Sequence, residues 1–438
     1  MSLLQRLLKL SSLAPAAPEA QAARVPRERL SVLSERPRAT RLSPAVVFTP
    51  TKPKLGSRHL TGRQVEQRRI LQALAEDRAH VVLYSERGRG KTSLSNMVVE
   101  SLRRSGVIVA RHTCDTGSTF DSILRGLVRD LPSSLLASPG TNIGEGCEAA
   151  LPNRTLRPGD LIALPDRLAC RSLVCLVDEF DRVEDSQTRT QLADGIKQLS
   201  DRDVPLLFLV VGVSENLDEI LGQHPSIQRS VLGIHLPLFT DRDVAQLIEK
   251  GGSESGFTFS DSAVARITVL SRGMPYMAQL LGLRLTQAAT ERGAFDVTDD
   301  DFEVAVSRLI ADANPRVLAL HAALTDRGRD AEMVAALRRL ATAPQDAWGR
   351  MEVMELPDGR VSVNDRRISR TCWQRLLDAG VFAPISTDSG LYVFAERLLM
   401  HHVLLLAAHD VAGFTGGVFD KTVPGKSPVM LRPVASKS

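Results

Sequence analysis

The stretch "VVLYSERGRGKTSLSNM", residues 81–97, decides the fold, because an apolar run passes into a glycine-rich segment and then into a helical pattern. Its GKT triplet, residues 90–92, fits the end of the pattern G-x-x-x-x-G-K-[ST], a loop that binds phosphate through backbone N–H groups. Ser85 stands where the pattern has its first glycine. We expect this serine to be tolerated if its φ angle is not positive, since Gly88 and Gly90 supply the backbone freedom nearer the phosphates.

A second motif, "LVCLVDEFDR", places Asp178 and Glu179 at the end of an apolar run. Carboxylates at the carboxyl end of a buried parallel strand lie at the edge where open α/β sheets bind ligands. We expect Lys91 to bridge the β and γ phosphates and Thr92 to offer its hydroxyl to Mg²⁺. Asp178 would hold Mg²⁺ through water, and Glu179 would activate the attacking water. The alternative is that the two carboxylates only cap the following helix.

Short apolar runs alternate with amphipathic segments from residue 59 to 239, which predicts an α/β core built on a parallel sheet. The predicted strands are 80–85, 107–113, 172–178, 205–213 and 233–238. Helices are expected between them, for instance at 92–104, 119–130 and 187–200. Five prolines make the stretch 132–165 a predicted loop-rich insertion.

After residue 239 the strand pattern stops. Thr240 with Asp243, and Thr298 with Asp301, have the spacing of capping boxes that open helices. Residues 240–311 are therefore predicted to form a small helical lid domain.

Residues 315–410 are predicted to form a winged-helix-like domain, because helices precede two apolar runs separated by the turn "STDSG". We expect helices at 330–341 and across "RRISRTCWQRLLDAG", residues 366–380. The second helix would have an apolar face with Ile368, Cys372 and Leu376, and a basic face with Arg366, Arg370 and Gln374. Residues 314–380 hold 11 Arg and 9 acidic residues, so DNA and protein remain alternative partners for that basic face.

The composition, 43% apolar and 24% charged, is that of a globular protein, and no apolar run approaches the roughly 20 residues of a membrane-spanning helix. Residues 1–63 carry 12 Lys/Arg and 3 Asp/Glu, so residues 1–58 are predicted to be a basic, disordered arm. A mitochondrial transit peptide is the alternative reading of that arm. Residues 411–438 are expected to be a loose tail.

Five cysteines form no C-x-x-C pair, which predicts reduced, buried thiols in a cytoplasmic protein. His401 and His402 are interpreted as the polar edge of a helix rather than as a zinc site.

Four segments together resemble a known family: "GRQVEQRRILQALAED", "SERGRGKTS", "LVDEFDR" and "VVGVSENLDEILGQHPSIQRSVLGIHL". Over roughly residues 59–311 they look like an AAA+ P-loop ATPase of the origin-recognition/initiator type, a group that includes many bacterial ATP-binding proteins and borders the STAND signalling ATPases. The resemblance implies a five-stranded parallel ASCE/AAA+ sheet with a helical lid, and ATP and Mg²⁺ as cofactors. The GKT and Asp178-Glu179 motifs would be its Walker A and Walker B motifs.

The resemblance also implies roles for individual residues. Gly62 and Arg63, through Glu66, would contact the adenine end of the nucleotide. Ser214, with Asn216 as second choice, would sense the γ-phosphate. Arg229 would be an arginine finger that completes a neighbour's site in a homo-oligomer, or else a surface arginine. The phosphate cradle would comprise Ser85, Glu86, Arg87, Gly88, Arg89, Gly90, Lys91, Thr92 and Ser93.

The chain departs from the family in the lid segment "SRGMPYMAQLL". Tyr276 stands where the family has its second-sensor arginine, and Arg272 is the nearest basic residue. This departure favours slow hydrolysis. The side chains of Arg87 and Arg89, unusual in such a loop, are expected to point to solvent.

The leading hypothesis is an ATPase that acts as a nucleotide-dependent switch on double-stranded DNA or on a protein complex. The first alternative is a DNA-binding regulator or scaffold with a vestigial nucleotide site. The second is a STAND-like signalling ATPase.

Overall fold

The computed structural model describes residues 42–51, 62–129, 131–136, 146–214, 220, 227, 229–385 and 389–412. Most of the predicted basic arm and nearly all of the predicted tail lie outside these residues. The chain divides into two compact units. The first comprises Met1–Gly256 with Met274–Gln279, and the second comprises Phe257–Gly273 with Leu280–Ser438.

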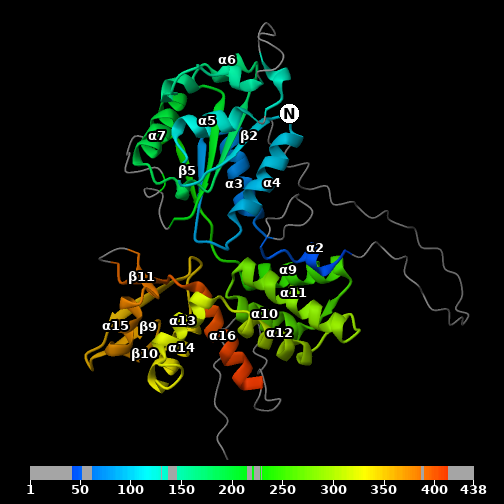
Figure 1. The fold of residues 1–438 in the computed structure, drawn as a ribbon, viewed down its shortest axis with the longest axis vertical. Coiled ribbons are helices and arrows are strands. Elements are labelled where there is room, and N and C mark those ends of the chain that lie inside the picture. The colour runs from blue at the N-terminus through cyan, green and yellow to red at the C-terminus, as the bar shows by residue number, and fades with distance from the viewer. Residues whose placement is uncertain are drawn as a thin grey trace, which may run out of the picture. The chain divides into compact units, whose positions relative to one another are not determined.

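The first unit contains a five-stranded sheet in the order β2-β3-β4-β1-β5, with every neighbouring pair parallel (Figure 1). Its strands are β1 (His80–Tyr84), β2 (Ile108–Thr113), β3 (Leu173–Asp178), β4 (Leu206–Gly212) and β5 (Val231–His235). The predicted parallel sheet is thus confirmed, although the last strand begins two residues earlier than expected. Because β4 lies between β1 and β3, the segments that follow β1 and β3 flank the end of β4.

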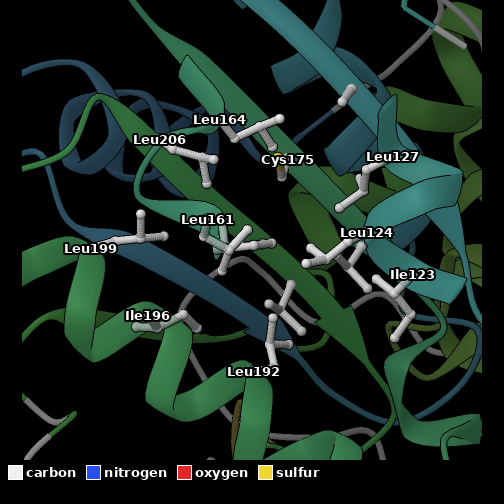
Figure 2. Close-up of a cluster of buried hydrophobic side chains, with 14 of the residues drawn as sticks. Ile123, Leu124, Leu127, Leu161, Leu164, Cys175, Leu192, Ile196, Leu199 and Leu206 are labelled. Atoms are coloured by element: carbon white, nitrogen blue, oxygen red, sulfur yellow. The ribbon is translucent and has the colours of Figure 1, made fainter. Parts of the chain in front are cut away.

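Helices cover both faces of this sheet. Val81 and Leu83 of β1 pack with residues of α3 (Gln64–Ala75) and α4 (Lys91–Arg104) in one hydrophobic cluster. Val82, between them, belongs to a second cluster with α5 (Phe120–Arg129) and α7 (Ser186–Asp201). Figure 2 shows part of this second cluster, with Leu124 and Leu127 from α5, Leu192 and Ile196 from α7, and Cys175 from β3. A strand buried on both faces reads as a continuous apolar run, which is why the sequence revealed these strands.

Among its described residues, the predicted loop-rich insertion contains the short helices η1 (Ser133–Leu135), η2 (Cys147–Ala150), η3 (Pro158–Leu161) and α6 (Leu164–Arg167), joined by irregular segments. Its leucines Leu156, Leu161 and Leu164 are buried in the second cluster. A Cβ added at Gly195 of α7 would lie 2.7 Å from Leu161 Cδ1, so the missing side chain lets η3 approach α7 closely. The prolines break regular helices without exposing the apolar side chains.

Helix α2 (Pro44–Val47) packs on α9 (Asp241–Ser255) within the first unit. Phe48 follows α2 and is 1% exposed, and a Cβ at Gly251 of α9 would lie 2.4 Å from its ring. Helix α9 begins with the predicted capping box of Thr240 and Asp243. A segment of the predicted basic arm is therefore anchored on α9 by an apolar contact.

The second unit holds α10 (Asp261–Ser271), α12 (Asp299–Ala311), α13 (Pro315–Leu324), α14 (Ala331–Ala341) and most of α11 (Pro275–Glu291). The short strands β6 (Thr258–Phe259) and β7 (Asp296–Val297) pair in parallel. The predicted capping box of Thr298 and Asp301 opens α12.

A five-stranded sheet in the order β10-β9-β8-β12-β11 completes the second unit, and the pairings along it are antiparallel. Its strands are β8 (Arg350–Glu355), β9 (Arg360–Val363), β10 (Arg366–Ser369), β11 (Phe382–Pro384) and β12 (Leu391–Phe394). The two apolar runs predicted as a hairpin are β11 and β12, which do pair, but β8 and β9 were not predicted.

The single helix predicted for residues 366–380 is wrong. Residues 366–369 pair with β9, and α15 (Arg370–Asp378) begins only after Ser369, whose Oγ accepts the N–H of Cys372 at 3.2 Å. Arg366 and Ile368 therefore lie on a strand and share no helix face with Arg370. The N-cap serine fixes the boundary, since its extended backbone cannot belong to the helix.

The interpretation of His401 and His402 as the polar edge of a helix is also wrong, because on α16 (Arg397–Ala412) they are 2% and 5% exposed. The His401 ring nitrogens lie 2.8 Å from the Arg397 carbonyl oxygen and 3.1 Å from that of Ser271. All five cysteines are free and buried, as predicted. Within the described residues, no helix is long and apolar enough to cross a membrane, and no three His, Cys, Asp or Glu side chains cluster as a metal site.

Candidate functional site

A cleft of about 600 Å³ lies at the carboxyl ends of β1, β3 and β4 in the first unit. The glycine-rich loop and the start of α4 line one side, and Asp178 and Glu179 line another together with the end of β4. Residues 49–51 and the first turn of α11 complete the lining. The two motifs singled out in the sequence therefore meet in one cleft, at the edge where parallel sheets bind ligands.

The glycine-rich loop has the backbone geometry of a phosphate cradle. Gly88 and Gly90 have φ angles of +82° and +91°, and α4 begins directly after Gly90. Ser85 is not among the residues with positive φ, so it meets the condition under which a serine is tolerated. It is fully buried, and its hydroxyl donates to the Glu86 carbonyl at 3.2 Å. The N–H groups at the start of α4 and the positive end of the helix dipole make this loop suited to an anion.

Lys91 is held inside the loop. Its Nζ donates to the carbonyl oxygens of Ser85 at 2.6 Å and Glu86 at 2.8 Å, and the residue is 9% exposed. Burial lowers the pKa of Lys91 to about 8. A cation prepositioned by two carbonyls needs little rearrangement to meet a phosphate.

Asp178 is buried at the tip of β3. One carboxylate oxygen accepts the Glu179 N–H at 3.0 Å, and the other lies 3.3 Å from a guanidinium nitrogen of Arg111. Burial raises the pKa of Asp178, while the Glu179 N–H and the Arg111 charge act in the opposite direction. A buried carboxylate at the ligand edge needs a positive partner.

Glu179 is half-exposed, with φ of +55°, and its carboxylate pairs with Arg182 at 3.0 Å. It occupies the N-cap position of η4 (Phe180–Arg182), but its side chain makes no capping hydrogen bond. The capping alternative therefore does not account for Glu179. Asp181 accepts the Val213 N–H at 2.8 Å, which ties the segment after β3 to the end of β4.

Thr92 and Asp178, the two residues expected to hold Mg²⁺, both line the cleft. A hydroxyl and a carboxylate are hard oxygen ligands, and Mg²⁺ in phosphate sites takes few protein ligands, with substrate phosphates and water supplying the rest. The donor set thus fits Mg²⁺ bound together with a nucleotide.

Arg89 does not point to solvent, so that expectation is wrong. Its side chain is fully buried, donates to the Leu236 carbonyl at 3.1 Å and pairs with Glu86 at 3.2 Å. Arg87, in contrast, is exposed and lines the cleft. The side chain of Arg89 connects the loop to the segment after β5.

Arg63 also connects the phosphate loop to the segment after β5. Its guanidinium donates to the carbonyls of Pro237 at 2.6 Å and Arg89 at 3.3 Å, pairs with Glu66 at 3.2 Å, and lies 4.5 Å from the Phe239 ring centroid. Burial lowers the pKa of Arg63 to about 10. Arg63 thus holds the backbone of the phosphate loop at Arg89.

Gly62, Arg63 and Glu66, expected at the adenine end, are not among the residues that line the cleft. Thr49, Pro50, Thr51, Pro275 and Gln279 line it instead. The Thr49 N–H donates to Gln279 Oε1 at 2.8 Å. Sequence reasoning missed this part of the lining, although an apolar pair, Val47-Phe48, interrupts the basic arm just before it.

Ser214 and Arg229 are not among the residues that line the cleft. Ser214 is 7% exposed and lies two residues beyond the end of β4, while Val213 beside it lines the cleft. Arg229 is exposed in the turn before β5. Asn216 lies outside the described residues.

The first turn of α11 brings Tyr276 into the cleft lining. A Cβ added at Gly88 would lie 3.0 Å from Met274 Cε and 3.5 Å from Tyr276 Cβ, so the loop and this segment are in close contact. Arg272, the nearest basic residue in the sequence, instead donates to the Ala343 carbonyl within the second unit. Among the described residues, the cations that line the cleft are those of Arg87, Lys91 and Arg182.

Arg111 and Asn96 were not predicted. Arg111 of β2 donates to Asn96 Oδ1 on α4 at 2.8 Å and pairs with Asp178. The signal was present, since an arginine near the carboxyl end of the predicted strand "VIVARHT" falls at the ligand edge of the sheet.

Comparisons with known proteins agree with this architecture. Residues 74–221, about a third of the chain, match the family model described as "AAA domain". A search of curated proteins finds no match.

Solved structures similar to the chain share little sequence with it. They include the Thermotoga maritima RuvB Holliday junction branch migration motor (TM-score 0.42, 16% identity, covering 81% of this chain and 98% of that one). They also include the Aeropyrum pernix ORC2 protein (0.47, 16%, 84% and 99%) and a Walker-type ATPase of Pyrococcus abyssi (0.48, 14%, 82% and 99%). The segment that matches the AAA domain model, residues 74–221, contains β1 to β4 of the parallel sheet and the glycine-rich loop after β1.

Proposed function

We propose that this protein is an ATP-binding AAA+ ATPase that hydrolyses ATP slowly and acts as a nucleotide-dependent switch on double-stranded DNA or a protein complex. The observation that carries the proposal is the convergence of Lys91 and Thr92 with Asp178 and Glu179 on one cleft. The parallel sheet brings the ends of β1 and β3 to one edge, and the residue types that the two motifs place there are those that nucleoside triphosphate chemistry requires.

The proposed roles follow from the donors in the cleft. The loop N–H groups and Lys91 bind the phosphates, with Lys91 exchanging the carbonyls of Ser85 and Glu86 for phosphate oxygens. Thr92 and Asp178 hold Mg²⁺, which supplies charge neutralisation of the phosphates when bound. Glu179 orients and accepts a proton from the attacking water.

Slow turnover is supported by two features. Glu179 is engaged with Arg182 at 3.0 Å, and an engaged carboxylate is a poorer base until that pair opens. Tyr276 replaces the arginine that would stabilise developing phosphoryl charge, and such an arginine is worth orders of magnitude in rate. A long-lived ATP state suits a switch better than a motor.

The switch itself would work through the cleft lining. Residues 49–51 and the first turn of α11 line the same cleft as the phosphate loop, and Gly88 lies close to Met274 and Tyr276. A bound nucleotide that moves the loop must therefore also move these segments. The exposed Arg229 remains our candidate arginine finger in a homo-oligomer. The second unit, which contains the antiparallel sheet, remains our candidate partner-binding domain.

The test uses two variants with opposite signatures. Lys91→Ala should weaken binding of a fluorescent ADP by about tenfold to a hundredfold, the value of one charged hydrogen-bonding group. Glu179→Gln should keep ATP bound while phosphate release falls by about a hundredfold or more. Exposed side chains away from the cleft supply the controls, Lys197→Ala and Glu184→Gln, which should leave both measurements unchanged. Unchanged nucleotide binding in Lys91→Ala would refute the proposal.

A second candidate function is a DNA-binding regulator with a vestigial nucleotide site, which the Tyr276 substitution favours. Duplex binding that ignores nucleotide and falls steeply with salt, together with no phosphate release above that of Glu179→Gln, would support it. A shift in particle size or duplex affinity on ATP addition would instead support the switch.

A further inference from the structure

The guanidinium of Arg111 pairs with Asp178, the carboxylate that the proposed function assigns to Mg²⁺. Arg111 NH2 lies 3.3 Å from one oxygen of Asp178, and the other oxygen of Asp178 accepts the Glu179 N–H. Both carboxylate oxygens are therefore engaged by groups of the protein itself.

The position of Arg111 is fixed by a second contact. Its NH1 donates to Asn96 Oδ1 at 2.8 Å. Asn96 lies four residues after Thr92 on α4, so the two share one face of that helix, one turn apart. Arg111 thus lies beside the one helix face and the one strand tip that would together hold the metal.

We propose that Arg111 is a positioning residue that serves as the built-in counter-cation of Asp178, competes with Mg²⁺ for it, and thereby sets the Mg²⁺ concentration at which nucleotide binds tightly. This inference rests on the proposed nucleotide site.

The burial of the two partners explains how such an exchange can work. Asp178 is 3% exposed, and a buried carboxylate without a positive neighbour is costly. The Arg111 side chain is 36% exposed, so it can withdraw toward water while Asn96 retains it near the site. Either cation can then neutralise Asp178, and the protein never has to leave that charge buried and unpaired.

The competition predicts two changes of opposite direction when the charge of Arg111 is removed. Without Mg²⁺, Asp178 would repel the phosphates with no counter-charge, so nucleotide affinity should fall. With Mg²⁺, Asp178 would be free of its competitor, so less Mg²⁺ should be needed. A merely structural role for Arg111 would weaken binding under both conditions, and direct contact with phosphate would weaken it without moving the Mg²⁺ midpoint.

The experiment is a titration of the full-length protein with fluorescent ADP, in EDTA and across a series of MgCl₂ concentrations. In Arg111→Met, which keeps the side-chain length, we expect affinity in EDTA to fall and the Mg²⁺ midpoint to fall by about threefold to fivefold, the scale of one partly exposed ion pair. Arg111→Lys keeps the charge and should restore a midpoint near that of the wild type.

A matched control is Arg103→Met. Arg103 of α4 also connects α4 with β2, donating to the Val109 carbonyl, but it is not the ion-pair partner of Asp178. Its loss should leave both titrations unchanged. If Arg111→Met does not fold, Asn96→Ser removes the anchor of Arg111 and should lower the midpoint by less.

The outcomes separate the two proposals. A wild type that binds fluorescent ADP with the same Mg²⁺ midpoint as Arg111→Met overturns the counter-cation role and leaves the nucleotide site intact. A wild type that binds no better than Lys91→Ala at any Mg²⁺ concentration overturns the nucleotide site itself, and this inference with it.

Discussion

The two five-stranded sheets of this protein differ in how they use their strand ends and faces. In the first unit every residue of β3 and β4 is buried, and all strand ends of one kind lie at one edge. In the second unit only Met351 of the six residues of β8 is buried, and antiparallel pairing sends neighbouring strand ends to opposite edges.

The difference explains where the charged groups do chemistry. The parallel sheet delivers Asp178, Glu179 and the loop after β1 to one cleft, where the buried charges of Asp178 and Lys91 each have specific partners. The antiparallel sheet pairs its charges locally on the surface, as in Arg370 with Glu355 at 2.7 Å. Exposed pairs of that kind contribute little to stability. The candidate site therefore belongs to the first unit.

The largest expected effect is on the free energy of unfolding, when one leucine in each sheet is replaced by alanine. Leu209 of β4 is fully buried, so Leu209→Ala should lower the free energy of unfolding of the first unit by about 2–5 kcal/mol. Leu391 of β12 is only half-buried, and Leu391→Ala should cost its own unit less than about 1.5 kcal/mol, because less area leaves water on folding. Hydrogen exchange of the β4 and β12 amides measures each unit separately. Equal losses in the two units would contradict the comparison.

A smaller effect contrasts two buried histidines. In the first unit, His80 Nδ1 accepts the Phe208 N–H at 3.0 Å, and burial lowers the pKa of His80 to about 4. The unfolded chain therefore binds more protons between pH 6.5 and 4, so stability present above pH 6.5 is lost as the pH falls. The loss should reach about 3 kcal/mol at pH 4 relative to His80→Gln, which does not titrate there.

In the second unit, burial likewise lowers the pKa of His401 to about 4, but its two partners are carbonyl oxygens. A protonated His401 can donate to both, whereas a protonated His80 loses the bond from Phe208. Because the pKa of each histidine is nevertheless lowered to about the same value, each should cost its own unit a similar amount of stability at pH 4. Unfolding of each unit followed between pH 7 and 4 for wild type, His80→Gln and His401→Gln measures this, and a histidine-dependent loss in one unit alone would contradict it.

The contrast between the parallel and the antiparallel sheet also decides which strands could be predicted from the sequence. The five parallel strands were predictable because strands buried on both faces leave long apolar runs, and the Lys91 and Asp178 motifs followed from their ends. The strands β8, β9 and β10 read "RMEVME", "RVSV" and "RRIS", with charges on their open faces, and nothing in them separates a half-exposed strand from a loop or helix.

The sequence also failed to predict the surroundings of three polar side chains. Arg89, His401 and Arg111 are polar in the sequence, and each has its place only because distant carbonyls or carboxylates meet it in the fold. Such partners are brought together by tertiary structure, so no local sequence pattern indicates them. The residues 49–51 escaped prediction for the same reason, since their position depends on Phe48 packing against Gly251 of α9.

The smallest expected effect is at Ser85, on the loop that the parallel sheet presents to the cleft. Ser85→Gly should change the dissociation constant for fluorescent ADP by less than about twofold, because Ser85 has no positive φ for a glycine to relieve. The added backbone freedom should lower stability by roughly 0.5–1 kcal/mol.

Gly88→Ala is the matched opposite. Its φ is +82°, and the new Cβ would lie 3.0 Å from Met274 Cε, so nucleotide affinity should fall by about tenfold or more. Titrations of both variants with fluorescent ADP, together with thermal unfolding, test the pair. If Ser85→Gly changed affinity as much as Gly88→Ala, the serine would be acting on the phosphates, directly or through Lys91, whose Nζ donates to its hydroxyl at 3.4 Å, rather than on the turn.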